Sequence, residues 1–262
     1  MPNHATTVFP GDLSLSGTFL ITGGTRGIGR AISLRLASAG AKVIANYLRN
    51  ENTANELKAL ADQKQLSIEL CRADLTTPNG LAQVEAAVKQ HGTQLAGLVH
   101  CAANGTHRPF EELTSRHLQW TMTLNVSSFF DLVKMFLPQF AAGSSIVALS
   151  SAGGMRAVPK YAVVGASKGA LESLVRHLAV ELAPRGVRVN AVAPGAVATE
   201  AWNSIPDRET RLAEAIRRSP SGRLVSPEEV AGAVHFLSSQ AASGINGQTL
   251  VVDGATGTIG GA

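Results

Sequence analysis

Thr22-Gly23-Gly24-Thr25-Arg26-Gly27-Ile28-Gly29 is the most informative segment of this chain. It follows the apolar run Phe19-Leu20-Ile21, which is typical of a buried strand, and it opens a segment from Ile28 to Leu36 with apolar residues at helical spacing. A glycine turn between a strand and a helix can hold a pyrophosphate, because the helix N-terminus offers unpaired N–H groups to the anion. Gly23 is expected to allow the sharp turn, Gly27 the approach of the ligand, and Gly29 close packing of helix on strand.

Apolar runs of strand length alternate with longer helical patterns along the rest of the chain. Strands are expected at residues 42–46, 66–71, 95–103, 145–149, 187–192 and 249–252, and helices at 51–64, 79–91, 115–140, 161–183 and 227–237. Pro138 should end or bend the long pattern of residues 115–140. Because the strands are continuously apolar, we predict an α/β fold: a Rossmann-like, doubly wound parallel sheet with helices on both faces.

The domain organisation is expected to be simple. We predict a polar N-terminal extension over residues 1–17 and a single nucleotide-binding domain of the Rossmann type over residues 18–262. Residues 199–222 form the longest poorly patterned segment, and they follow the sixth strand. Ligands of a doubly wound sheet bind beyond the carboxyl ends of the strands, so this segment is a candidate lid.

Composition restricts the classes of function. The 262 residues are 45% hydrophobic, which allows one sizeable core, and the formal net charge of +4 is scattered rather than gathered into a stripe for nucleic acid. No run approaches the ~18 apolar residues of a membrane span. Cys71 and Cys101 lie in apolar runs, which favours free buried thiols and a reducing, cytoplasmic location over a disulfide. His107, His117 and His177 lack metal-ligand spacing, so no metal is expected.

A second group of residues has side chains that could transfer a proton. Ser150 and Ser151 follow the fifth expected strand, and Tyr161 and Lys168 belong to the next helical pattern. A free phenol has a pKa near 10, and a neighbouring ammonium should lower it, so that Tyr161 could exchange a proton near neutral pH. The alternative is that Tyr161 is an ordinary interfacial aromatic residue and Lys168 a solvated helix lysine.

The glycine turn has the spacing T-G-x-x-x-G-x-G, which resembles the short-chain dehydrogenase/reductase family. The resemblance spans about residues 17–254. The matching positions are an aspartate after the third strand, an asparagine on the long helix, a serine after the fifth strand, and a P-G turn with a threonine after the sixth: Asp74, Asn125, Ser151, Pro194, Gly195 and Thr199. Where the family has an N-N-A-G-like turn this chain has His100-Cys101-Ala102-Ala103, and His100 is expected to be packed rather than catalytic.

The resemblance implies roles for individual residues. It implies that the catalytic residues are Asn125, Ser151, Tyr161 and Lys168. It implies that the cofactor is held by Gly23, Thr25, Arg26, Gly27, Ile28, Gly29, Asn46, Arg49, Asp74, Leu75, Ala102, Lys168, Pro194, Gly195 and Thr199. Lys168 would bind the ribose and Thr199 the nicotinamide carboxamide. The resemblance also implies a homotetramer packed through two long helices.

The position of the tyrosine departs from the common family pattern Y-x-x-x-K. That pattern requires a tyrosine at position 164, where this chain has Val164, and Tyr161 gives Y-x6-K instead. This spacing resembles the type III bacterial enoyl-acyl-carrier-protein reductases, although Ala157 stands where that branch has a second tyrosine. Seven residues span about two helical turns, ~10.5 Å, so Tyr161 can face the same way as Lys168 from farther back. In enoyl reduction the developing enolate oxygen lies two carbons from the hydride acceptor, which suits a displaced phenol.

The cofactor preference is predicted from the end of the second strand. Relatives that prefer NAD place an acidic residue there to hold the ribose 2′-hydroxyl, whereas this chain has Asn46-Tyr47-Leu48-Arg49. Arg26 and Arg49 could pair with a 2′-phosphate, and both could instead be plain surface arginines. The missing acid favours NADPH.

Three functions follow as hypotheses. The first is NADPH-dependent reduction of the C=C bond of an enoyl thioester, carried by coenzyme A or acyl-carrier protein, in fatty-acid or polyketide metabolism. The second is a ketoreductase of the same family that acts on a 3-oxoacyl or polyketide carbonyl. The third is a non-catalytic nucleotide sensor, which retention of Asn125, Ser151, Tyr161 and Lys168 disfavours. No nucleic-acid or membrane partner is expected.

Overall fold

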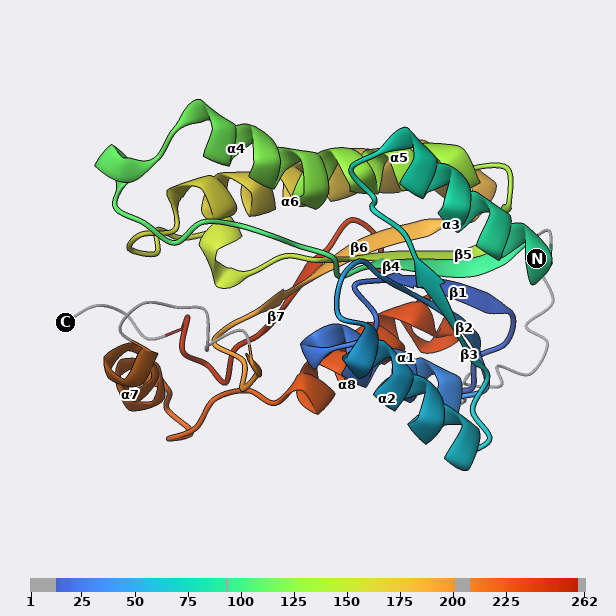
Figure 1. Cartoon of the computed structure of the whole chain (residues 1–262), viewed down its shortest axis with the longest axis horizontal. Helices are drawn as coiled ribbons and strands as arrows, with labels where there is room; N and C mark the ends of the chain where they lie inside the picture. The colour runs from blue at the N-terminus through green and yellow to red at the C-terminus, as the bar shows by residue number, and fades with distance from the viewer. Residues whose placement is uncertain (1–12, 93, 201–207, 259–262) are drawn as a thin grey trace, which may run out of the picture.

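The structure is a computed structural model that describes residues 13–92, 94–200 and 208–258. Seven parallel strands form one sheet in the order β3-β2-β1-β4-β5-β6-β7 (Figure 1). The strands are β1 (Thr18–Thr22), β2 (Lys42–Tyr47), β3 (Ile68–Arg72), β4 (Leu95–His100), β5 (Phe140–Leu149), β6 (Arg188–Pro194) and β7 (Thr249–Val252). The predicted doubly wound α/β fold is confirmed.

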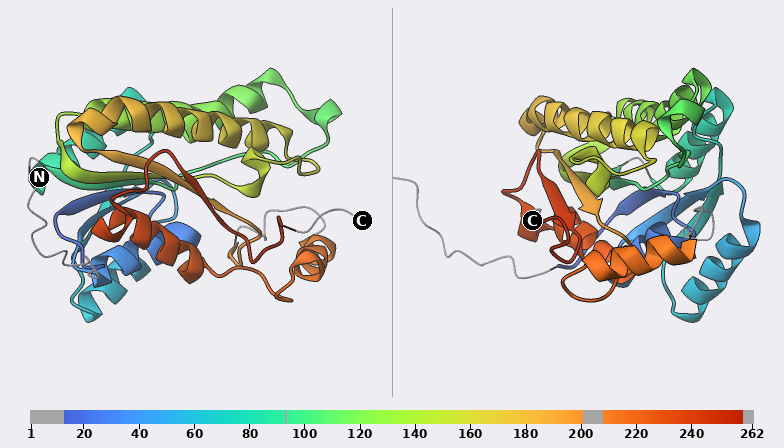
Figure 2. Two further views of the ribbon diagram at one scale, coloured as in Figure 1. Left: turned by 180° about the vertical axis from the view of Figure 1, so that it is seen from behind. Right: turned by 90° about the vertical axis from the view of Figure 1, so that its left-hand side faces the viewer.

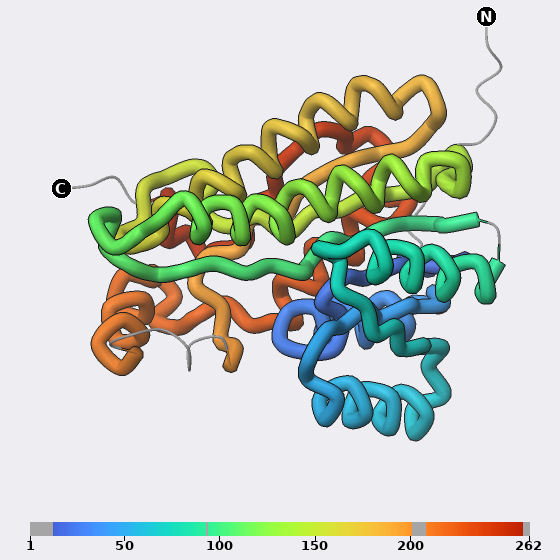
Figure 3. The backbone as a smooth tube through the Cα atoms, turned by 45° about the horizontal axis from the view of Figure 1, so that its top comes forward, coloured from blue at the N-terminus to red at the C-terminus, as the bar shows by residue number. Residues whose placement is uncertain are grey.

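Helices cover both faces of the sheet, and Figure 2 shows the two layers from behind and from one end. The helices are α1 (Gly27–Ser38), α2 (Glu51–Gln63), α3 (Pro78–Gln90), α4 (Ser115–Met122), α5 (Ser128–Phe136), α6 (Ala162–Leu182), α7 (Arg208–Arg218) and α8 (Pro227–Ser238). Helices α1, α2 and α8 lie on one face, and α3, α4, α5 and α6 lie on the other (Figure 1). Figure 3 shows α6 running beside α4 and α5.

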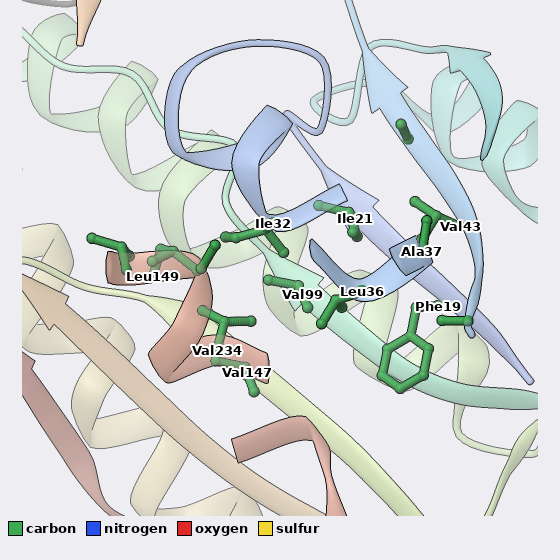
Figure 4. Packing of buried hydrophobic residues seen from close by; sticks show 14 of the residues in the cluster. Phe19, Ile21, Ile32, Leu36, Ala37, Val43, Val99, Val147, Leu149 and Val234 are labelled. Atoms are coloured by element: carbon green, nitrogen blue, oxygen red, sulfur yellow. The ribbon is translucent and has the colours of Figure 1, made fainter. Parts of the chain in front are cut away.

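Two apolar clusters hold these layers on the sheet. On one face Ile32 and Leu36 of α1 and Val234 of α8 pack against strand residues such as Ile21 and Val99 (Figure 4). On the other face a second cluster joins α3, α5 and α6 to the same strands. Because strands β1 to β6 bury apolar residues on both sides, their residues supply both clusters, and this explains why those strand sequences do not alternate.

Three details differ from the expected elements. The pattern at 115–140 is interrupted by a π-helical turn, Thr123–Ser127, and its last helix ends at Phe136, ahead of Pro138 as predicted. Strand β5 starts five residues earlier than expected, at Phe140. The expected lid segment contains α7, which the sequence pattern did not indicate, and its residues 201–207 lie outside the described part of the chain.

The sheet order places a crevice at its carboxyl edge. Strand β1 pairs with β2 on one side and with β4 on the other, so the chain reverses its direction of winding there. Ligands bind at such a switch point in open α/β sheets. The glycine turn that follows β1 and the loops that follow β4 and β5 therefore meet at one place.

The described end of the N-terminal extension is packed against this domain. The Leu15 N–H donates to the Ala39 carbonyl over 2.7 Å, and the Leu15 side chain is buried. His235 of α8 lies 2.6 Å from the Leu13 carbonyl oxygen through Nε2. Residues 1–12 lie outside the described chain.

Candidate active site

The glycine turn forms a cradle that side chains would fill. Gly23 and Gly27 have φ angles of 63° and 50°, a region that favours glycine. A Cβ atom on Gly23 would lie 3.0 Å from the Ala102 Cα atom, and one on Gly29 would lie 2.0 Å from the Gly23 carbonyl oxygen. Helix α1 begins at Gly27, and the Arg26 side chain does not cap its N-terminal N–H groups. The open N–H groups beside glycines fit a pyrophosphate.

Some of the other predicted cofactor residues on this side are exposed to a ligand, and others form hydrogen bonds within the domain. Arg26 and Arg49 are exposed, with their guanidinium groups available to a ligand. The Asn46 amide is buried and donates to the Cys71 and Ala73 carbonyls over 3.2 and 3.1 Å, so its side chain joins β2 to β3. Asp74 Oδ1 accepts from the Thr76 N–H and hydroxyl, and the neighbouring Leu75 is buried.

The predicted residues after β4 and β6 complete the rim. The Ala102 N–H donates to Thr22 Oγ1 over 3.0 Å. The Gly195 N–H donates to the Val252 carbonyl over 3.0 Å, which fixes the turn after Pro194. Thr199 lies over the glycine turn, since a Cβ atom on Gly27 would stand 3.6 Å from the Thr199 Cγ2 atom. This places Thr199 where a ligand in the cradle would meet it.

His100 is packed behind the glycine turn, as expected. Its Nδ1 atom lies 3.1 Å from Thr22 Oγ1, which also accepts the N–H of Cys101 and of Ala102. The Thr22 hydroxyl therefore donates to Nδ1, and this selects the neutral imidazole with its proton on Nε2. Its ring centroid lies 5.4 Å from that of Phe129.

The environment of His100 strongly disfavours the imidazolium. Burial and then the charge of Lys168 lower the pKa of His100 to about 3, and the backbone groups of Leu124 and Asn125 partly oppose this effect. Among the described residues the buried Nε2 atom makes no hydrogen bond of good geometry, although the backbone groups of Leu124 and Asn125 lie nearby. His100 thus supports the turn as a neutral side chain.

Tyr161 and Ser151 form a hydroxyl pair at the end of β5. The Tyr161 hydroxyl donates to Ser151 Oγ over 3.3 Å, and the same oxygen accepts the Gly153 N–H over 3.1 Å. The phenol ring lies against Gly153 and Gly165, where Cβ atoms would come within 2.5 and 3.6 Å of ring carbons. Glycines at these positions make room for the ring.

The expected lowering of the Tyr161 pKa is wrong for this structure. Burial raises the pKa of Tyr161, and the hydrogen bond with Ser151 only partly opposes the change. The nearby ammonium does not act as expected, because Lys168 Nζ donates to the Leu149 carbonyl over 2.6 Å instead. A phenol with a raised pKa keeps its proton at neutral pH and can donate it.

Lys168 is buried beside a carboxylate on its own helix. Desolvation lowers the pKa of Lys168 to about 8, and the negative charge of the Glu172 carboxylate opposes this change. Glu172 also accepts a hydrogen bond from Ser150 Oγ. Burial raises the pKa of Cys101 to about 11, so this free thiol stays protonated. Glu172, which the sequence analysis did not single out, therefore bonds Ser150 and acts on Lys168 through its charge.

Asn125 lies in the π-helical turn and holds the surrounding backbone. Its Oδ1 atom accepts the Asn104 N–H over 2.9 Å, and its Nδ2 atom donates to the Asn104 carbonyl and to Ser167 Oγ over 3.0 and 2.9 Å. These bonds join the loop after β4 to α6. Asn125 therefore positions the site rather than contacting Tyr161 or Lys168 through the hydrogen bonds of the described structure.

Two further residues shape the surroundings of the phenol. The His107 ring stands edge-on to Tyr161 with centroids 5.1 Å apart, and burial followed by the charge of Arg211 on α7 lowers the pKa of His107. Val164 is buried, and a Cβ atom on Gly105 would lie 2.1 Å from its Cγ2 atom. Only the tertiary structure reveals these contacts, because His107 shows no informative spacing in the sequence.

A glycine cradle at a helix N-terminus, next to a serine–tyrosine pair and a buried lysine, defines a nucleotide-dependent oxidoreductase of the doubly wound class. Comparison with known proteins agrees. The family model described as "Enoyl-(Acyl carrier protein) reductase" matches residues 23–256. The chain belongs to the short-chain dehydrogenase/reductase family and is an oxidoreductase.

Individual relatives are similar over nearly their whole length. The chain is 35% identical over 237 residues to 1-cyclohexenylcarbonyl-CoA reductase of Streptomyces collinus, covering 90% of this chain and 85% of that protein. The NADP-bound angucycline C-6 ketoreductase LanV is 31% identical, with a TM-score of 0.85 and coverage of 93% and 98%. A gluconate 5-dehydrogenase candidate from Beutenbergia cavernae, with NADP bound, is 33% identical, with a TM-score of 0.86 and coverage of 95% and 100%.

Proposed function

We propose that this protein is an NADPH-dependent reductase of the C=C bond of an enoyl thioester. The observation that carries the proposal is the pair of positions 161 and 164: Tyr161 lies against Ser151, while Val164 is apolar and packed at Gly105. The Tyr161 hydroxyl therefore comes from three residues before position 164, and we infer that this placement suits a hydrogen bond to an enolate oxygen. The family model's description supports the proposal, as does the S. collinus relative, whose named substrate is itself an α,β-unsaturated thioester.

The residues of the site have distinct parts in the proposed reaction. When bound, the reduced nicotinamide supplies a hydride, which the β-carbon of the substrate accepts. Tyr161 donates a hydrogen bond to the thioester oxygen and stabilises the negative charge that develops there. The enolate then takes up a proton from water at its α-carbon, which completes the saturated thioester. Ser151 orients the phenol, and the raised pKa of Tyr161 keeps its proton available. Lys168 supplies a positive charge beneath the site and a ribose contact.

We propose NADPH as the cofactor, held by the residues named above at the carboxyl edge of the sheet. Support comes from the exposed Arg26 and Arg49, the absence of an acid in residues 46–49, and the NADP found in two structural neighbours. Cations at these positions would pair with a 2′-phosphate. Asn46, Asp74 and Leu75 would act mainly through the shape of the strand ends that they stabilise.

Ketone reduction is the second candidate, and the similarity to the ketoreductase LanV favours it. Here Tyr161 or Ser151 would donate to the carbonyl oxygen of a 3-oxoacyl or polyketide substrate. In that reaction hydride and proton are delivered to adjacent atoms, so the phenol would have to reach the reacting carbonyl itself. The packed Val164 offers no proton at that point.

We also propose a cytoplasmic homotetramer. Phe130 on α5 and Val180 on α6 are apolar and 45% and 76% exposed, on the two helices that Figure 3 shows side by side. Burial of such side chains favours association. Within the described chain, no helix combines the length and hydropathy needed to cross a bilayer.

The experiment that separates the two reactions follows NADPH oxidation with crotonyl and acetoacetyl thioesters side by side. We expect turnover of the crotonyl thioester and little or none of the acetoacetyl thioester. Ready reduction of the ketone together with no reduction of the crotonyl thioester would contradict the proposal. A protein that oxidises NADPH with neither substrate would return the sensor hypothesis to consideration.

A further inference from the structure

A cavity of about 460 Å³ opens beside Tyr161. Its walls come from the loop before α4, from the connection between β5 and α6, and from the first turns of α6: Arg108, Phe110, Gly153, Gly154, Met155, Arg156, Ala157, Val158, Lys160, Tyr161, Ala162, Gly165 and Ala166. Its size is within the ~300–1,000 Å³ range of small-molecule sites. Both views in Figures 1 and 2 place these two loops at the same end of the molecule as α7.

The charged residues that line the cavity are all basic. Arg108, Arg156 and Lys160 are its charged residues, and no aspartate or glutamate is among its described lining residues. Arg108 lies 3.9 Å from Glu112, the limit of an ion pair, and Arg156 is 3.5 Å from Asp253. Asp253 therefore balances the charge of Arg156, and the charges of Lys160 and of the weakly paired Arg108 could be balanced by an anionic ligand.

The same cavity also has exposed apolar side chains in its walls. Phe110 is 80% exposed, and Met155 and Val158 are 46% and 43% exposed. A ligand that satisfies both properties carries an anionic group at one end and a slender, partly apolar chain beyond it. The chain would run towards Tyr161, which lines the cavity and also bonds Ser151.

Lys160 lines the cavity, directly precedes Tyr161 in the chain and has an unusual backbone conformation. Its φ angle of 60° lies in the left-handed region, which is unfavourable for a lysine. Such strain persists at functional sites where the surroundings impose it. Here it occurs one residue before Tyr161, so an anion bound at Lys160 would lie next to the residue that would meet the substrate.

We propose that this cavity binds the phosphopantetheine arm of the thioester substrate, with its phosphate at Arg108 and Lys160 and its alkyl–amide chain along Phe110, Met155 and Val158. The proposal rests on the enoyl-thioester function above. It assigns recognition to the shared arm of coenzyme A and acyl-carrier protein. The thioester end of the arm then lies at Tyr161, and the acyl chain extends beyond it into the crevice.

The test compares substrates that contain or lack the phosphate. Arg108→Glu and Lys160→Glu are assayed with crotonyl-CoA, with crotonyl-acyl-carrier protein and with crotonyl-N-acetylcysteamine, which has the end of the arm and no phosphate. Lys64→Glu is the matched control, because Lys64 is exposed at the end of α2 on the other face of the sheet. Circular dichroism and NADPH affinity confirm that each variant is folded.

We expect each cavity variant to lower kcat/KM about tenfold or more for both phosphate-bearing substrates, mainly through KM, because charge-assisted hydrogen bonds are strong. For crotonyl-N-acetylcysteamine, and for Lys64→Glu with every substrate, the change should stay within about twofold. Free 4′-phosphopantetheine should inhibit the parent more strongly than pantetheine does. The variants should remove that difference.

Other outcomes overturn the assignment. Equal losses with all three substrates would mean that the cations do not recognise the phosphate. A loss with crotonyl-CoA alone would assign recognition to the nucleotide of coenzyme A, and a loss with the carrier protein alone would assign it to the carrier surface. If the parent reduces no crotonyl thioester at all, the proposed function fails first, and this result is distinct from parental activity that the substitutions leave unchanged.

Discussion

Replacing His100 with asparagine should change how the stability of this protein depends on pH. The imidazole is fully buried behind the glycine turn, accepts from Thr22, and has its pKa lowered to about 3. Asparagine can accept the same hydrogen bond and does not titrate. The variant therefore retains a partner for Thr22 while it removes the buried titratable group.

The sign and size of the effect follow from the two pKa values of His100. The unfolded chain binds a proton near pH 6.5, whereas the folded protein resists protonation down to about pH 3, so acid favours unfolding throughout that window. Between pH 7 and pH 5 this group alone should lower the free energy of unfolding by about 2 kcal/mol. Asparagine makes no such contribution.

Urea unfolding at pH 5, 6 and 7, at one fixed protein concentration, measures this difference. The parent should lose about 2 kcal/mol more than His100→Asn does over that range, whatever the absolute stability of the variant at pH 7. Effects of other titrating groups cancel in the comparison. Parallel pH dependences for the two proteins would refute the buried, neutral state of His100.

The remaining predictions concern the site. Tyr161→Phe should lower kcat by ~10²–10⁴-fold with NADPH affinity nearly unchanged, and a variant within about threefold of the parent would show that another group donates the proton. Glu172→Gln removes a carboxylate that raises the Lys168 pKa, so the alkaline limb of the kcat/KM profile should move to lower pH, and an unmoved limb would contradict this coupling. Arg49→Ala should raise KM for NADPH and barely alter KM for NADH, and equal effects on both cofactors would remove its assigned contact with the 2′-phosphate.

The sheet and most helices could be predicted from sequence because their signals are local. Strands buried on both faces read as continuous apolar runs. Helix α8 begins with a local signal, because Ser226 Oγ accepts the Glu229 N–H and Pro227 occupies the first helical position. Helix α7 could not be predicted in this way. None of its described side chains is buried, and only a short set of half-buried apolar residues, Leu212, Ala215 and Ile216, marks its inner face.

The sequence predicted which residues belong to the site, but not their hydrogen bonds, burial or pKa values. Tyr161, Ser151 and Lys168 are brought to one strand end, yet the pKa of Tyr161 is set by burial and by the hydrogen bond with Ser151, which spacing does not reveal. The π-helical turn at Asn125 likewise depends on bonds to Asn104 and Ser167, 21 and 42 residues away in sequence. Contacts between residues far apart in sequence determine these properties, whereas a sequence motif identifies only which residues belong to the site.

The position of transferred deuterium tests the proposed reaction most directly. The parent is supplied with NADPH deuterated at nicotinamide C4, together with an equimolar mixture of crotonyl and acetoacetyl thioesters, and the products are analysed by NMR. Enoyl reduction predicts deuterium at the β-carbon of a butyryl thioester, with the phenol of Tyr161 at the thioester oxygen. Deuterium at the carbinol carbon of a 3-hydroxybutyryl thioester, with the crotonyl thioester recovered unchanged, would contradict it.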